Sequence, residues 1–243
     1  MVAGMLLVNK PRGMTSHDVV QIVRRKLGVR QIGHTGTLDP MAEGLLILLV
    51  GSATKYQQAF QGHDKIYEAT IAFGTQTDTG DALGHVVRSV SVPTLDQSRV
   101  AEVLAGFRGS FAQTPPTYSA VKVQGRPAYW WARRQQPQVL AARRVQVSDI
   151  TLLECEPSTL TFRLCCSAGT YVRTLAESIA ERLGTVGHVT SLTRLRIGQW
   201  HLDDAKPLTW MTEATPAAIV RELRVVTAVH AQHSSSSPSN TTV

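Results

Sequence analysis

Hydrophobic residues repeat with different spacings along the chain, and each spacing predicts a different element. A continuous apolar run over 45–50 predicts a fully buried strand, and alternating apolar residues over 65–73 predict a strand with one buried face. Between Thr15 and Gly28 the apolar positions follow helical spacing, with a hydroxyl N-cap before them and a glycine after them. The pattern therefore predicts both strands and helices.

The same reasoning assigns the other elements. Strands are expected over 5–8, 84–88, 109–113, 118–123, 143–154 and 159–167, and helices over 94–105, with Thr94 as cap, over 128–135 and over 170–183. Turn residues at 77–81 predict a hairpin between 65–73 and 84–88. Because strands and helices alternate irregularly, we expect an α+β fold with a mixed, mostly antiparallel sheet flanked by helices.

Composition limits the class of protein. The 243 residues are 43% hydrophobic, which is enough for one large domain with its own core. The apolar run over 45–50 is far shorter than the roughly 20 residues that cross a bilayer, and the N-terminus lacks the basic region of a signal peptide. Cys155, Cys165 and Cys166 do not have metal-binding spacing, which favours reduced thiols in a cytoplasmic protein.

Positive charge is concentrated in two segments. The chain has 25 Lys and Arg against 18 Asp and Glu, a formal net charge of +7 that indicates a polyanionic partner. Residues 125–146 contain arginines and aromatic residues without an acid, and residues 10–30 contain one acid, Asp18. Such clusters bind phosphates, although solvated helix faces also carry them. The basic residues are Arg126, Arg133, Arg134, Arg143 and Arg144 in the first segment and Lys10, Arg12, Arg24, Arg25, Lys26 and Arg30 in the second.

The glycine-rich segment over 33–46 carries the candidate chemistry. Its glycines allow close backbone approach, and Pro40 restricts the chain beside Asp39, so the segment can present one carboxylate at the mouth of a cleft. A purely structural turn is an equal alternative on these grounds. The segment matches neither phosphate-loop nor dinucleotide-binding spacing, so no nucleotide cofactor is expected.

Several ordered blocks, taken with this segment, resemble the TruB family of bacterial tRNA pseudouridine-55 synthases. Other pseudouridine synthase families usually read His-Arg-Leu-Asp where this chain has Gly36-Thr37-Leu38-Asp39. Two positions depart from the family pattern, since Ala168 stands where a lysine is usual and Thr193 where an arginine is frequent. The matching blocks are residues 9–16, 33–46, 64–69, 74–81, 115–125 and 167–175.

The resemblance implies an isomerase with the pseudouridine synthase catalytic fold. It would flip the T-loop uridine of tRNA into a pocket and convert it to pseudouridine, without cofactor or metal. Asp39 would be the catalytic carboxylate, whether by attack on the anomeric carbon, by attack on the base or by assisting deprotonation of the ribose. The resemblance implies substrate-binding roles for His34, Tyr67, Tyr171, Arg173 and Leu192, with Arg173 paired to Asp39 and Tyr67 stacked on the base.

The resemblance also implies a domain organisation. The catalytic domain is expected over 1–204, and 205–243 is expected to be a short extension with a disordered tail, too short for the complete PUA-like domain that family members commonly carry. His230 and His233 fall in that tail and are expected to be solvated rather than to bind metal. We expect a cytoplasmic monomer that acts on the T arm of tRNA. A non-enzymatic RNA-folding factor and a guide-dependent synthase of the dyskerin type are the alternatives.

Overall fold

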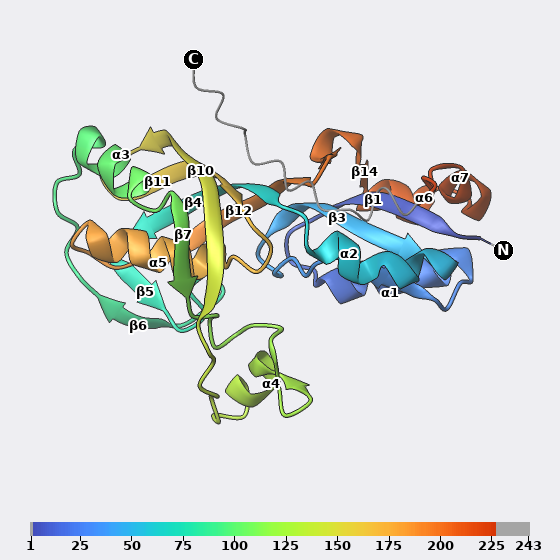
Figure 1. Ribbon diagram of the computed structural model, residues 1–243, viewed down its shortest axis with the longest axis horizontal. Coiled ribbons are helices and arrows are strands. Elements are labelled where there is room, and N and C mark those ends of the chain that lie inside the picture. Colours follow the sequence, from blue (N-terminus) through green and yellow to red (C-terminus); the bar gives the residue numbers. More distant parts are fainter. Residues whose placement is uncertain (1, 227–243) are drawn as a thin grey trace, which may run out of the picture.

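The computed structural model describes residues 2–226 and is built around one large sheet (Figure 1). Within these residues, ten strands form that sheet, and eight of them follow the order β14-β1-β3-β12-β4-β11-β10-β7. The strands are β1 (Gly4–Lys10), β2 (Ile32–His34), β3 (Glu43–Val50), β4 (Lys65–Phe73), β7 (Gly109–Gln113), β10 (Arg143–Cys155), β11 (Thr159–Cys166), β12 (Gly187–Ile197), β13 (Trp200–His201) and β14 (Lys206–Pro207).

Helices and short hairpins flank the sheet. The helices are α1 (Ser16–Leu27), α2 (Gln57–Gln61), α3 (Gln97–Ala105), α4 (Ala128–Ala132), α5 (Val172–Arg182), α6 (Leu208–Glu213) and α7 (Pro216–Arg221), with 3-10 turns η1 (Gly51–Tyr56) and η2 (Leu202–Asp204). The hairpins are β5 (Thr75–Thr77) with β6 (Val86–Ser89) and β8 (Lys122–Val123) with β9 (Arg126–Pro127). Most strand pairs are antiparallel, whereas β1 with β14 and β3 with β12 are parallel. The α+β fold with a mixed, mostly antiparallel sheet is thus confirmed.

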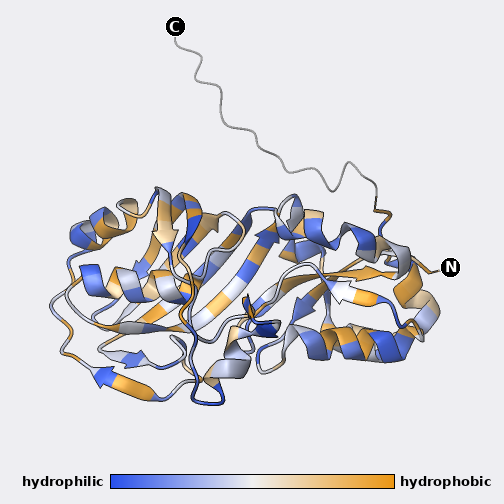
Figure 2. Ribbon diagram, turned by 60° about the horizontal axis from the view of Figure 1, so that its bottom comes forward, coloured by the Kyte–Doolittle hydropathy of each residue, from blue (hydrophilic) through white to orange (hydrophobic). Residues whose placement is uncertain are grey.

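The core explains the two hydrophobic patterns. β3 is buried along nearly its whole length because α1, α6 and α7 cover one of its faces and the aromatic residues Phe60 and Trp200 lie on the other. A strand covered on both faces needs a continuous apolar run. β4 alternates strictly between more and less buried residues, with its buried face packed under α3 and α5. Figure 2 shows the corresponding mixture of hydrophilic and hydrophobic residues along the flanking helices.

Local signals placed α1 correctly. The Thr15 hydroxyl accepts a hydrogen bond from the Asp18 backbone N–H at 3.1 Å, and the Asp18 carboxylate accepts one from the Thr15 N–H at 2.9 Å. Gly28 ends the helix with φ +66°, a conformation that favours glycine. The strands predicted over 5–8, 109–113, 143–154 and 159–167 are confirmed as β1, β7, β10 and β11.

Other predictions need correction. The strand over 65–73 does not form a hairpin with 84–88, because β4 pairs with β11 and β12 while β6 pairs with β5. α3 is capped by Asp96, whose carboxylate accepts from the Arg99 N–H at 3.2 Å, and not by Thr94. Of the strand predicted over 118–123, only Lys122–Val123 forms. The hairpin was wrong because the sheet partners of β4 lie far away in the sequence.

The predicted bounds of two further helices differ from the observed ones by only one to three residues. The helix predicted over 170–183 is α5, which begins two residues later, and the one predicted over 128–135 is α4, which ends three residues earlier. The predicted apolar face of α5 is confirmed, since Leu175, Ile179 and Leu183 are buried. β12 was not predicted at all, and β2 lies within the predicted loop.

Residues after Asp204 fold back onto the first strand. β14 pairs in parallel with β1, and α6 and α7 contribute Leu208, Met211 and Ile219 to the core beside α1. Residues 227–243, with His230, His233 and the predicted tail, lie outside the described residues. Cys155, Cys165 and Cys166 are free thiols, as predicted. In the described part of the chain, the helices are too short or too polar to cross a bilayer.

Candidate active site

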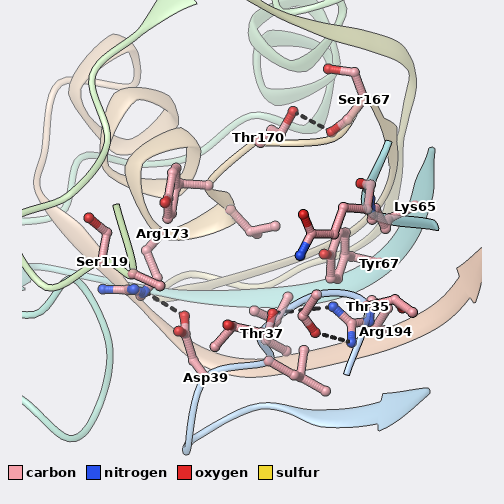
Figure 3. A pocket seen from close by; sticks show the side chains of 18 residues that line it. Thr35, Thr37, Asp39, Lys65, Tyr67, Ser119, Ser167, Thr170, Arg173 and Arg194 are labelled. Atoms are coloured by element: carbon pink, nitrogen blue, oxygen red, sulfur yellow. Dashed lines mark hydrogen bonds and ion pairs between the residues drawn. The ribbon is translucent and has the colours of Figure 1, made fainter. Parts of the chain in front are cut away.

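A cavity of about 310 Å³ opens where the loop before β3 meets β4, β12 and the start of α5 (Figure 3). Five of the six residues that the sequence predicted line it: Asp39, Tyr67, Tyr171, Arg173 and Leu192. They come from four elements that are distant in sequence, so only the folded sheet brings them together. We call residues 35–42 the catalytic loop.

Asp39 and Arg173 form an ion pair at the mouth of the cavity. Nε of Arg173 donates to Oδ2 of Asp39 at 2.8 Å. The Arg173 side chain is only 4% exposed, whereas that of Asp39 is 31% exposed. The remaining guanidinium nitrogens donate to the backbone carbonyls of Thr79 at 2.6 Å and Tyr118 at 2.9 Å. A buried, fully engaged arginine therefore orients a carboxylate that stays open to a ligand.

A second carboxylate stands behind this pair. Oδ2 of Asp81 lies 3.8 Å from Nε of Arg173, and Asp81 is buried. Its other oxygen accepts from the Thr79 hydroxyl at 2.8 Å and from the Leu83 N–H at 3.0 Å. The single guanidinium is therefore held between two carboxylates.

The first turn of α1 braces the catalytic loop. The Ser16 hydroxyl is buried, donates to the Leu38 carbonyl at 3.0 Å and accepts from the Leu38 N–H at 2.8 Å. The Gly13 N–H donates to the Pro40 carbonyl at 2.8 Å, so the segment before α1 contacts the loop as well. This contact explains why residues 9–16 belong to the same motif set as Asp39.

Tyr67 and Leu192 form adjoining parts of the cavity wall. Tyr67 lies on the buried face of β4, and Leu192 lies on the neighbouring β12, where it pairs with Ala69. Burial raises the pKa of the Tyr67 hydroxyl, and the nearby positive charge of Arg194 opposes that rise. An aromatic ring and an aliphatic side chain on adjoining strands make an apolar slot for a flat ligand.

Tyr171 is held through its backbone. It caps α5, and the Gln113 side chain donates to its carbonyl at 3.0 Å and accepts from its N–H at 2.8 Å. Burial raises the pKa of the Tyr171 hydroxyl. Since Arg173 follows two residues later, the two hydrogen bonds from Gln113 also help to position the arginine.

His34 is the predicted residue that does not line the cavity. It lies on β2, directly before the pocket residue Thr35, and its buried Nδ1 has no hydrogen-bond partner within the described residues. Burial, followed by the charge of Arg194, lowers the pKa of His34 from 6.5 to about 4, so its ring is neutral at pH 7. Its contact with substrate stays a prediction.

Two buried cations at the cavity were missed from the sequence. Lys65 and Arg194 both line it, and burial lowers the pKa of Lys65 to about 8. Both could have been found from the period of two in a strand, because Lys65 precedes Tyr67 by two residues and Arg194 follows Leu192 by two. For Arg194 that signal required β12, which was not predicted, whereas Lys65 lies on the strand predicted over 65–73.

The first basic segment forms an exposed projection. Residues 114–142, which we call the insertion, extend away from the sheet between β7 and β10 (Figure 1). The guanidinium of Arg134 lies 3.6 Å from the Trp130 ring centre, and that of Arg126 lies 5.4 Å from it on the same ring. Arginine and aromatic groups are thus presented together, as nucleic-acid-binding surfaces require.

The second basic segment needs a correction. Lys10 is fully buried, and its ammonium group donates to the carbonyls of Pro11 at 2.8 Å and Met14 at 2.7 Å. Burial lowers the pKa of Lys10 to about 8. This lysine therefore supports the backbone under the site and does not belong to a phosphate-binding surface.

Comparison with known proteins places these features in a family. The model of the N-terminal domain of TruB family pseudouridylate synthases matches residues 24–172. The chain is 47% identical over 216 residues to tRNA pseudouridine synthase B of Aromatoleum aromaticum, covering 89% of this chain and 70% of that protein. The proteins of the same name from Chromohalobacter salexigens and Opitutus terrae are 48% and 45% identical, and this chain covers 66% and 85% of their lengths.

Solved structures give a matching fold. A chain of an H/ACA ribonucleoprotein bound to a substrate RNA containing 2'-deoxyuridine aligns with a TM-score of 0.65 and 25% identity, covering 86% of this chain and 52% of that chain. A chain of a Cbf5-Nop10-Gar1 complex aligns with a TM-score of 0.68 and 25% identity, covering 91% of this chain and 60% of that chain. This chain thus spans between half and two thirds of these longer relatives.

Proposed function

The chain belongs to the TruB family of pseudouridylate synthases, and we propose that it converts uridine 55 in the T loop of tRNA to pseudouridine. The observation that carries the proposal is the Asp39–Arg173 ion pair, with a nitrogen–oxygen distance of 2.8 Å, at an open cavity walled by Tyr67. The tRNA specificity follows from the relatives named tRNA pseudouridine synthase B.

The cavity suits a flipped base. A uridine inside a folded T loop is out of reach, so the enzyme extrudes it and replaces the lost stacking with contacts of its own. Tyr67 supplies an aromatic face, and Leu192 closes the slot beside it. A stacked base contributes about 1–3 kcal/mol, which offsets the cost of unstacking.

The reaction is an isomerisation in which all atoms are retained. The bond from N1 of uracil to C1′ breaks, the base turns within the pocket, a bond from C5 to C1′ forms, and the proton on C5 is released as N1 gains one. Asp39 is the carboxylate that drives cleavage, through the anomeric carbon, the base or deprotonation of the ribose. Arg173 keeps this carboxylate aimed at the ligand.

RNA binding is assigned to the exposed basic groups. The insertion presents Arg126, Arg133 and Arg134 beside Tyr129 and Trp130, and phosphate contacts from such groups give affinity that falls with salt. The T arm is the part of tRNA that brings uridine 55 to the cavity. We propose that the protein acts as a monomer in the cytoplasm.

The stand-alone tRNA enzyme is favoured over a guide-dependent synthase. Identity to the bacterial tRNA pseudouridine synthase B proteins is 45–48%, against 25% to the chains from H/ACA complexes. The proposal therefore predicts activity on a tRNA transcript in the absence of guide RNA.

The test uses an unmodified tRNA transcript and base-resolution mapping of pseudouridine. The wild-type protein is expected to modify position 55 alone. Asp39→Asn keeps the size of the side chain and one acceptor oxygen but removes its charge, so it is expected to bind the transcript and form no pseudouridine.

Asp203→Asn is the matched control, because Asp203 is exposed on η2 and does not line the cavity. It is expected to retain full activity. Pseudouridine formation by Asp39→Asn at the wild-type rate contradicts the assigned role. Activity that appears only after a guide RNA is added contradicts the stand-alone function.

A further inference from the structure

Arg194 is a fully buried cation that the proposed chemistry does not use. It is 1% exposed, on β12, where it pairs with Tyr67 of β4 on one side and with Gly44 of β3 on the other. Within residues 2–226, no carboxylate lies within 4.0 Å of its guanidinium group. A buried arginine without an ion pair is costly, so its position calls for another set of partners.

Those partners are backbone carbonyls at both ends of the loop that carries Asp39. Nε of Arg194 donates to the Leu45 carbonyl at 2.8 Å. The terminal nitrogens donate to the carbonyls of Thr37 at 3.3 Å and Gly36 at 3.2 Å (Figure 3). Gly36 and Thr37 precede Asp39, whereas Leu45 follows it on β3. One planar group therefore spans the loop and fixes the distance between its ends.

The backbone of Arg194 also packs against the end of this loop, at Gly44. A β-carbon on Gly44 would lie 2.5 Å from the Arg194 carbonyl oxygen, and Gly44 has φ +106°, a conformation that favours glycine. β12 and β3 therefore touch directly where the loop rejoins the sheet. Both the side chain and the backbone of Arg194, on β12, therefore contact the loop.

We propose that Arg194 is a positioning residue that clamps the loop from Gly36 to Leu45 and so holds Asp39 in reach of the nucleotide. The inference rests on the proposed function, which supplies the reaction that depends on this placement. It assigns to Arg194 a role separate from that of Arg173, which contacts the carboxylate itself. The side chain of Arg194 acts on Asp39 through the loop backbone, and it also hydrogen-bonds the Tyr67 hydroxyl.

The variants Arg194→Met and Arg194→Lys test the clamp. Methionine fills the space without any donor, and a misplacement of about 1 Å at a reacting group costs on the order of 100-fold in rate, so we expect a loss of that size in single-turnover pseudouridine formation. Lysine keeps the charge but not the planar fork, so we expect a smaller loss of about tenfold. Affinity for the tRNA transcript is expected to stay within about threefold of wild type.

Arg196→Met is the matched control. Arg196 lies on the same strand, two residues further on, and contacts Cys165 Sγ at 3.9 Å rather than the loop. It is expected to retain the wild-type rate. If Arg194→Met does not fold, as judged by thermal melting, Arg194→Lys decides the question.

Hydrogen exchange in the protein without RNA gives a readout that is independent of activity. The N–H groups of Leu38 and Ala42 are hydrogen-bonded to Ser16 Oγ and to the Asp39 carbonyl, at 2.8 Å and 3.1 Å. Their exchange is expected to accelerate in Arg194→Met and to stay unchanged in Arg196→Met.

Three results would overturn the clamp: a single-turnover rate of Arg194→Met within about threefold of wild type, unchanged exchange in the loop, or equal losses in Arg194→Met and Arg196→Met. A wild-type protein that forms no pseudouridine overturns the proposed function instead. In that case exchange in the loop still decides whether Arg194 holds it.

Discussion

The catalytic loop and the insertion both lack regular structure for most of their length, yet they are built in opposite ways. The catalytic loop is held from three sides, by Ser16, by Arg173 and by Arg194. The insertion is exposed and organised around its own aromatic and arginine side chains, such as Trp130 and Arg134. The difference fits the proposed function, in which the reaction needs a fixed carboxylate and RNA binds to an exposed surface.

Arg173 of α5 joins the two regions through two hydrogen bonds. Arg173 donates to the carbonyl of Tyr118, at the root of the insertion, while its Nε holds Asp39. The buried arginine is therefore the point at which the rigid region and the exposed region meet. The following predictions alter one region at a time.

Substitution of Arg173 should give the largest effect. Arg173→Met leaves Asp39 and two backbone carbonyls without their donor and Asp81 without its cationic neighbour, and breaking a buried pair costs about 3–5 kcal/mol in the free energy of unfolding. Because the carboxylate also loses the group that orients it, we expect a loss on the order of 10³-fold in single-turnover rate. A loss smaller than tenfold, measured with properly folded protein, would show that the carboxylate is positioned without the arginine.

Ser16→Ala removes the hydroxyl that bonds both backbone groups of Leu38. Leaving two buried groups unsatisfied costs about 1–3 kcal/mol in the free energy of unfolding. Thermal or urea unfolding measures the change, and Ser110→Ala, on the exposed face of β7, is the control with little expected effect. Equal stability of both variants would contradict the bracing of the catalytic loop by α1.

Arg134→Ala changes the insertion alone. Loss of one phosphate-binding cation should reduce the salt dependence of tRNA binding by a slope of about one and leave the single-turnover rate of the bound complex unchanged. Arg221→Ala, on the exposed side of α7, is the control. Ser119 and Ala120 of the insertion line the cavity, and a slower chemical step in Arg134→Ala would show that Arg134 acts on the cavity through them.

The effect of His34 on stability should be absent at neutral pH and appear only in acid. Its folded-state pKa of about 4 lies below the unfolded value of 6.5, so between these values the unfolded chain binds more protons. Stability is therefore full above pH 6.5 and is lost as the pH falls towards 4. His34→Asn should flatten the stability curve in this window, as followed by urea unfolding. An unchanged slope would mean that the ring is solvated.

Sequence patterns within one short stretch predicted the elements that such a stretch defines. The capping box and Gly28 define α1 within one stretch of sequence, and the period of two defines β4. β12 carried no such clean pattern, because its bulges against β4 after Val189 and Arg194 interrupt the alternation. Its absence from the prediction hid Arg194, although Leu192 on the same strand was found through the motif resemblance.

The sequence by itself determined the strand and helix periods, the catalytic candidate Asp39 and the family resemblance that named its partners. Only the tertiary structure decided that Arg173 reaches Asp39 across 134 positions, that Arg194 reaches Thr37 across 157, and that Lys10 is buried. Periodicity and motifs are properties of neighbouring residues. Contacts between distant positions depend on the order of strands in the sheet, which brings β3, β12 and β4 side by side beneath one cavity.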